Sequence, residues 1–171
     1  MEEVRSLIDQ VIMEHQQIIS STQISTRKAN DVAILLKLQG PAEDFVSAGT
    51  NELRRKLRNL RRALKKVEQL LQGHFDREET LISKAFGKHR TVTFASALSV
   101  LLDDHEQLRK RITRSREWAD ELVTGTLSSE AWETKAYVMR SYLTHTLKLL
   151  KAHAETEEGL LKALRKELSK Q

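Results

Sequence analysis

An apolar residue recurs at every third or fourth position of this 171-residue sequence over four long stretches, and this leaves few folds open. The stretches run over residues 4–36, 53–81, 94–122 and 132–168. This spacing gathers the apolar side chains on one face of an α-helix, because a helix has about 3.6 residues per turn. Such a face must be buried against other helices. The sequence therefore predicts four amphipathic helices that pack together.

Three short breaks separate the stretches. Gly40 and Pro41 form a helix-ending pair, residues 87–90 interrupt the chain again, and small polar residues fill 124–129, where Ser129 can cap the next helix. Short connections make successive helices antiparallel. We predict an all-α fold, an antiparallel up-down-up-down four-helix bundle with long helices, spanning residues 1–171 as one domain.

The composition agrees with a helical chain and excludes several classes of protein. There is one proline and there are six glycines. The sequence has no cysteine, which excludes disulfides, thiolate metal sites and cysteine nucleophiles. No apolar run reaches the roughly 18 residues of a membrane span. The amino terminus lacks the basic-then-apolar pattern of a secretion signal, so we expect a cytoplasmic location without membrane association.

Polar residues interrupt the apolar faces at six positions. A histidine and a glutamate stand four residues apart in the second stretch and again in the fourth, which puts both members of each pair on one helix face. The first and third stretches each carry one histidine on the apolar face. In chain order the six candidate metal ligands are His15, His74, Glu78, His105, His153 and Glu157.

The sequence separations place the four histidines at one level of the bundle. In an antiparallel pair, residues equally far from the connecting loop lie at the same height. The midpoint between His15 and His74 falls within residues 40–49, and the midpoint between His74 and His105 falls within 87–90. The midpoint between His105 and His153 falls within 124–129. The two glutamates follow their histidines by one turn on parallel helices, so they are expected to face each other beside the histidine level.

Imidazole nitrogens and carboxylate oxygens together suit iron, manganese or zinc, and two bridging carboxylates favour a pair of ions. Burying two carboxylates without cations would be costly. A lone histidine on an apolar face is more often a packed core residue, and this interpretation applies to His15 or His105 taken singly. It does not account for six matched residues. We single out no catalytic residue, and whether the chain is an enzyme stays open.

The polar residues next to the candidate ligands are either surface charges or additional metal ligands. Glu79, Glu106, Glu155 and Glu158 adjoin candidate ligands but lie off the apolar face, so we interpret them as surface charges. Glu79 or Glu158 would become an extra ligand only if its helix were locally distorted. His145 lies one step off the apolar face and is the weakest candidate for a supporting role.

Four hydroxyl residues lie on the apolar faces on one side of the predicted site. They either line a wet path to the metals or bond to their own helix backbone. These residues are Thr22, Ser25, Ser115 and Thr146.

The order His, His-x-x-x-Glu, His, His-x-x-x-Glu resembles the hemerythrin-like (HHE cation-binding) domain over essentially the whole chain. The resemblance implies two iron ions in an oxo- or hydroxo-bridged, non-haem di-iron centre. It makes His15, His74, His105 and His153 terminal ligands, with Glu78 and Glu157 as bridges. Oxygen-carrying hemerythrins have a further histidine where this chain has Arg109. The ligand set is closest to that of the di-iron repair-of-iron-centres proteins, which usually carry a cysteine-containing domain that this sequence lacks.

The resemblance implies a protein that binds or reacts with a small diatomic or peroxide ligand (oxygen, peroxide or nitric oxide), in stress response or sensing, with a redox partner. One alternative is iron storage or delivery. Another is a basic helical binding module with a structural metal, since residues 54–66 carry eight basic and no acidic side chains. Aromatic residues are not interleaved with these charges, so we do not favour nucleic acid as the partner. The physiological ligand and the oligomeric state stay open.

Overall fold

The structure, a computed structural model, describes residues 2–39, 48–86, 92–124 and 129–168. In these residues the chain forms four α-helices, α1 (Glu2–Gln39), α2 (Ala48–Phe86), α3 (Val92–Thr124) and α4 (Ser129–Leu168). The predicted all-α fold is confirmed. The helices end where the breaks were predicted, and the connections at 40–47, 87–91 and 125–128 lie outside the described residues.

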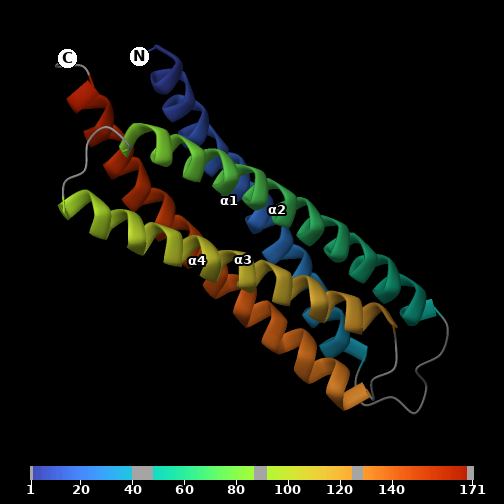
Figure 1. The fold of residues 1–171 in the computed structure, drawn as a ribbon. Helices are drawn as coiled ribbons and strands as arrows, with labels where there is room; N and C mark the ends of the chain where they lie inside the picture. The colour runs from blue at the N-terminus through green and yellow to red at the C-terminus, as the bar shows by residue number, and fades with distance from the viewer. Residues whose placement is uncertain (1, 40–47, 87–91, 125–128, 169–171) are drawn as a thin grey trace.

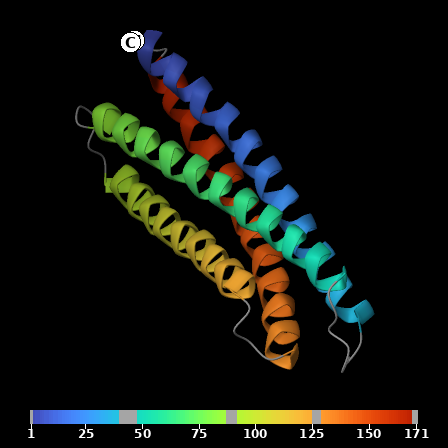
Figure 2. The same ribbon diagram turned by 90° about the vertical axis from the view of Figure 1, so that its right-hand side faces the viewer.

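The four long helices run side by side in alternating directions (Figure 1). Each helix packs against its neighbours in the chain, and α1 also packs against α4, which closes the bundle. The view turned by 90° shows the start of α1 beside the end of α4 (Figure 2). The antiparallel four-helix bundle is therefore confirmed. None of the helices in the described part of the chain combines the length and apolar character of a bilayer-spanning segment.

The apolar core continues on both sides of one polar level. On the side of the chain termini it consists of a cluster with Ile8, Val11, Leu81 and Leu161. On the other side a larger cluster begins with Leu71 and Phe75 and is followed by a run of fully buried leucines on α2. Burial of each such side chain contributes roughly 1.5–3 kcal/mol. The polar level is thus enclosed by apolar side chains along the bundle axis.

The apolar face of α4 is rotated relative to the prediction. Tyr142, Leu149 and Leu160 were expected to be buried but are only partly buried. The side chains buried in their place are Leu143, Leu150 and Leu161. The buried positions alternate between steps of four and three residues from Trp132 through Ala136, a small residue that gives little signal in a sequence pattern. The ring of Tyr142 lies instead under the Arg111 guanidinium, 3.9 Å from its carbon.

The four hydroxyl residues on the predicted wet path are buried and hydrogen-bonded to their own helices. Thr22 donates to the carbonyl of Ile18 at 2.8 Å, and Thr146 donates to that of Tyr142 at 2.8 Å. Ser25 and Ser115 each bond the carbonyl four residues earlier in the same way. Since these bonds satisfy the hydroxyl donors, the wet path loses its support, and bonding to the helix backbone is confirmed.

Candidate metal centre

One histidine from each helix lies at the polar level. His15, His74, His105 and His153 are 3%, 1%, 0% and 5% exposed. The ring centroids of His15 and His74 are 4.7 Å apart, and those of His105 and His153 are 5.0 Å apart. Across the bundle interface between α1 and α4, the rings of His15 and His153 are separated by 6.4 Å. The predicted common level of the four imidazoles is confirmed.

Two buried carboxylates face these imidazoles. Glu78 is 0% exposed and Glu157 is 1% exposed. His105 Nε2 lies 2.9 Å from Glu78 Oε2. His15 Nε2 donates to Glu157 Oε2 at 2.7 Å, and His153 Nε2 lies 3.4 Å from the same oxygen. The structure therefore brings all six candidate residues together, with Nε2 of the imidazoles turned toward the carboxylates.

Several polar atoms at the centre of this cluster lack a hydrogen-bond partner among the described residues. Both carboxylate oxygens of Glu78 are buried and lack such a partner. The same is true of the Nε2 atoms of His74, His105 and His153. Leaving a buried polar group unsatisfied costs about 1–3 kcal/mol. Coordination to a metal ion uses these same lone pairs. Nitrogen and oxygen donors without thiolate suit iron, manganese or zinc, so the residues present fit a metal centre.

The ligand-type atoms form two overlapping groups, each with its atoms within 4.8 Å of one another. The larger group consists of Glu78, His105, His153 and Glu157. The smaller group consists of His15, His74 and Glu157. His74 Nε2 also lies 3.9 Å from Glu78 Oε2, so Glu78 approaches the smaller group. Glu157 belongs to both groups, which is the arrangement that a carboxylate shared between two neighbouring cations requires.

The two glutamates differ in their electrostatic surroundings. Burial raises the pKa of Glu78 above its ordinary value, and the Glu157 carboxylate adds to this increase. Burial acts in the same direction on Glu157, but the hydrogen bond from His15 and the nearby imidazoles of His153 and His74 outweigh it and lower the pKa of Glu157. Glu157 is therefore held as a carboxylate by imidazoles, whereas Glu78 depends on another positive charge for its ionised form.

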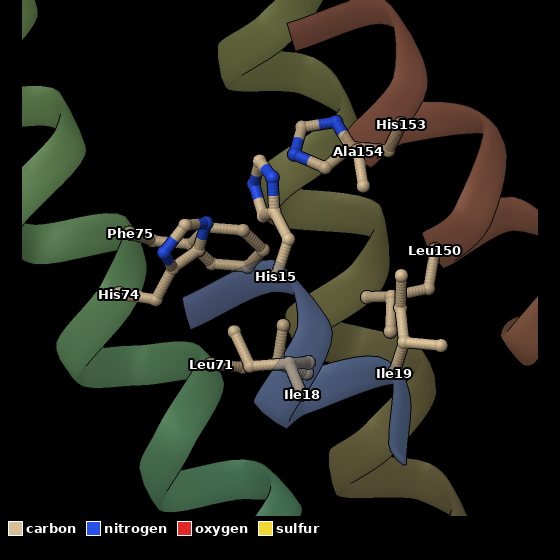
Figure 3. Close-up of a pocket in the computed structure, with 9 residues that line it drawn as sticks. All are labelled: His15, Ile18, Ile19, Leu71, His74, Phe75, Leu150, His153 and Ala154. Atoms are coloured by element: carbon tan, nitrogen blue, oxygen red, sulfur yellow. The ribbon is translucent and has the colours of Figure 1, made fainter. Parts of the chain in front are cut away.

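A small cavity of about 10 Å³ adjoins the smaller group. The imidazoles of His15, His74 and His153 form one side of it, and Leu71 and Leu150 contribute to an apolar opposite side (Figure 3). This volume is about the minimum that one water-sized molecule requires. The three-residue group thus has fewer protein donors than the four-residue group and has the space for a small ligand beside it.

The comparison with protein families matches the hemerythrin HHE cation binding domain to residues 6–164. The chain belongs to the hemerythrin family. The family predicted from the order of histidines and glutamates is confirmed, and with the cluster of buried donors it makes this chain a metal-binding domain. Searches of curated proteins and of solved structures gave no match.

Two carboxylates of this hemerythrin domain that contact the histidines from outside were missed in the sequence analysis. His74 Nδ1–H donates to Glu14 Oε2 at 3.1 Å, and His105 Nδ1–H donates to Glu79 Oε1 at 3.0 Å. The interpretation of Glu79 as a surface charge was wrong. Both glutamates directly adjoin a buried site residue in sequence, and such a position flanks the neighbouring helix. Each bond fixes the tautomer that leaves the Nε2 lone pair facing the interior.

Arg109 supports His105 from outside the cluster. Its Nη2 donates to Glu79 Oε1 at 3.0 Å, and its guanidinium carbon lies 5.0 Å from the centroid of the Phe75 ring. Phe75 in turn stacks on the imidazole of His105, with centroids 3.8 Å apart. The residue that replaces a further histidine of the oxygen carriers therefore stabilises the carboxylate and the aromatic ring on either side of His105.

Other polar residues near the hemerythrin centre face solvent. Glu106, Glu155 and His145 are exposed. The interpretation of Glu106 and Glu155 as surface charges is therefore confirmed. The basic residues of α2 are partly paired, since Arg61 contacts Asp120 of α3. These contacts are typical of a solvated charged face.

Proposed function

We propose that this hemerythrin domain holds two iron ions and binds or reacts with a small oxidant, namely oxygen, peroxide or nitric oxide. The observation that carries the proposal is the pair of overlapping donor groups, with the cavity beside the smaller one. Membership of the family supports a small ligand. The proposed ligands are His15, His74, His105 and His153, with Glu157 common to both donor groups and Glu78 in the larger group.

The unequal donor sets support a division of labour between the two positions. The position at Glu78, His105, His153 and Glu157 has four protein donors, and the position at His15, His74 and Glu157 has three. Iron in such sites accepts more donors than these, so the second position keeps more room for an exogenous ligand. The cavity beside His15 and His74 is where that ligand would sit.

The surrounding residues prepare this position for a small apolar molecule. A bound di-iron centre supplies exchangeable coordination positions and takes up or releases electrons. Around it, Ile18, Leu71 and Leu150 are 2%, 2% and 4% exposed, and they exclude bulk water from the cavity. The apolar side walls therefore favour oxygen or nitric oxide over strongly hydrated anions, whereas peroxide would fit by its small size alone.

Metal content is the first test. The purified protein, reconstituted with Fe²⁺ without oxygen and then oxidised, is expected to retain about two irons per chain and to absorb in the near ultraviolet, as coupled ferric pairs do. Zinc gives no such band. A protein that retains no iron, or retains one ion without that absorption, would contradict the di-iron proposal.

Reactivity is the second test. The reduced protein is mixed with oxygen, peroxide or nitric oxide in a stopped-flow instrument, beside the variant Ala154→Leu. Ala154 lines the cavity, so a leucine there is expected to slow ligand binding while the iron content stays unchanged. Equal rates in both proteins would show that the ligand does not use this cavity. Iron that is released without reacting with any of the three oxidants would favour storage or delivery.

A further inference from the structure

Four carboxylates surround the histidine level in a closed ring. Each helix supplies a carboxylate to the histidine of the following helix, and α4 supplies one to α1. The pairs are Glu14 with His74, Glu79 with His105, Asp104 with His153, and Glu158 with His15. In every pair the carboxylate approaches the Nδ1 atom, the side of the ring that faces away from the two central glutamates.

The four contacts are not equivalent. The carboxylates of Glu14 and Glu79 lie 3.1 and 3.0 Å from their imidazoles and accept hydrogen bonds. The Asp104 carboxylate lies 3.6 Å from His153, and the Glu158 carboxylate lies 4.0 Å from His15. The last two separations exceed the usual length of a hydrogen bond. Two of the four imidazoles are therefore held firmly from outside, and two are not.

An arginine stands behind each of the two firm contacts. Arg77 Nη2 lies 2.8 Å from Glu14 Oε1, and Arg109 Nη2 lies 3.0 Å from Glu79 Oε1. Charge-assisted contacts of this kind restrict the rotamers of both partners. The arginine therefore holds the carboxylate in place, and the carboxylate holds the imidazole.

The firm and loose histidines are divided evenly between the two donor groups. His105, in the larger group, and His74, in the smaller group, are firmly held. The loosely held histidines are His153 in the larger group and His15 in the smaller group. His153 and His15 belong to α4 and α1, and both rings line the cavity together with the firmly held ring of His74 (Figure 3).

We propose that Glu14 and Glu79 are positioning residues that anchor one histidine at each metal position, His74 and His105. The other two histidines, His15 and His153, adjust their orientation when a metal or a small ligand arrives from the cavity. This inference rests on the proposed function, because it takes the six central residues as metal ligands.

The physical basis is the cost of ordering a ligand. An Nδ1–H bond to a fixed carboxylate sets the tautomer and rotation of the ring before the metal binds, and loss of such a partner typically lowers metal affinity roughly 10–100-fold. The Nδ1 atoms of His15 and His153 have no such bond to the described residues, so no described residue outside the cluster fixes the rotation of these two rings before the metal binds. The anchored histidines, His74 and His105, therefore increase the affinity for the metal. The adjustable histidines, His15 and His153, permit a change in metal coordination.

Co²⁺ binding to the metal-free protein, followed by visible absorption, tests the inference. The variants Glu14→Ala and Glu79→Ala remove the acceptor of the Nδ1–H bond. Each is expected to weaken binding at one of the two positions, roughly 10–100-fold. Asp104→Ala and Glu158→Ala are expected to bind as the control does. The control is Glu106→Ala, an exposed glutamate next to His105 on the same helix.

A second measurement separates positioning from a general structural effect. Nitrogen-15 NMR of the metal-free protein is expected to show two histidine Nδ1–H signals protected from solvent exchange. Glu14→Ala is expected to expose one signal and Glu79→Ala the other, without a change in helix content. Protected signals from His15 and His153 instead, or equal Co²⁺ affinities for all five variants, would overturn the inference. Failure of the wild-type protein to bind Co²⁺ would overturn the proposed function alone, since the NMR result needs no metal.

Discussion

Glutamine substitutions at the two central glutamates are expected to act with opposite signs on the stability of the metal-free protein. Glu157 accepts a hydrogen bond from His15 at 2.7 Å and lies within 3.4 Å of His153 Nε2. Both oxygens of Glu78 lack a hydrogen bond to the described residues, and burial raises its pKa. The first carboxylate is stabilised by its neighbours, and the second is buried at a cost.

The magnitude follows from these contacts. Glu157→Gln replaces a hydrogen bond to a charged group by a neutral one, which costs about 1–2 kcal/mol. For a chain of this size, 1 kcal/mol shifts Tm by about 2–4 °C, so Tm is expected to fall by roughly 2–8 °C. Glu78→Gln loses no hydrogen bond. His105 Nε2 lies 2.9 Å from Glu78 Oε2, so the glutamine amide can donate a hydrogen bond to this nitrogen. Its Tm is expected to stay level or rise.

Thermal unfolding of the metal-free proteins by circular dichroism measures both effects, with Glu155→Gln, an exposed position on α4, as the control. Because the pKa of Glu157 in the folded protein is lowered, its stabilisation is present above the ordinary pKa of a glutamate and is lost as the pH falls below it. The unfolding curves of wild type and Glu157→Gln should therefore converge in acid. Equal losses of Tm at both positions near neutral pH would refute the reasoning.

Three further outcomes are expected. Burial opposes the protonation of His74, but the Glu157 carboxylate outweighs it and raises the pKa of His74 above its ordinary value in the metal-free protein. Because a metal ion competes with that proton, Zn²⁺ affinity measured at a series of pH values should fall, and a dye should report more protons released on binding, as the pH drops below the raised pKa. Thr22→Val and Thr146→Val should leave azide binding rates unchanged, because both hydroxyls bond their own helices; slower rates would restore the wet path. Leu64→Ala, in a fully buried position, should lower the free energy of unfolding in urea by about 2–5 kcal/mol while the iron content stays the same.

Much of the fold and the centre of the site could be predicted because both depend on distances along a helix. The spacing of His74 and Glu78 fixes their common face without reference to any other helix. The shared level of His15 and His105 follows from counting residues to the connecting loops, since every helix rises by the same length per residue. Neither argument requires knowledge of side-chain packing.

The prediction failed where the rotation of a helix about its own axis matters. On α4 the buried side chain is Leu150 and not Leu149, although both are leucines and they are adjacent in sequence. The contact of Glu79 with His105 depends on the same kind of lateral detail. The spacing along one helix locates the centre of its apolar face only to within about one residue. Packing against the neighbouring helices determines which of two adjacent side chains is buried.

The sequence by itself determined four amphipathic helices, their alternating directions, and one level at which four imidazoles and two carboxylates meet. Only the tertiary structure decided that Glu157 is shared by two donor groups, that burial outweighs the contact of Glu78 with His105, and that a cavity adjoins His15. The physical reason is that helix periodicity is a local property of the chain. The partners of each buried atom depend on how all four helices are rotated and packed against one another.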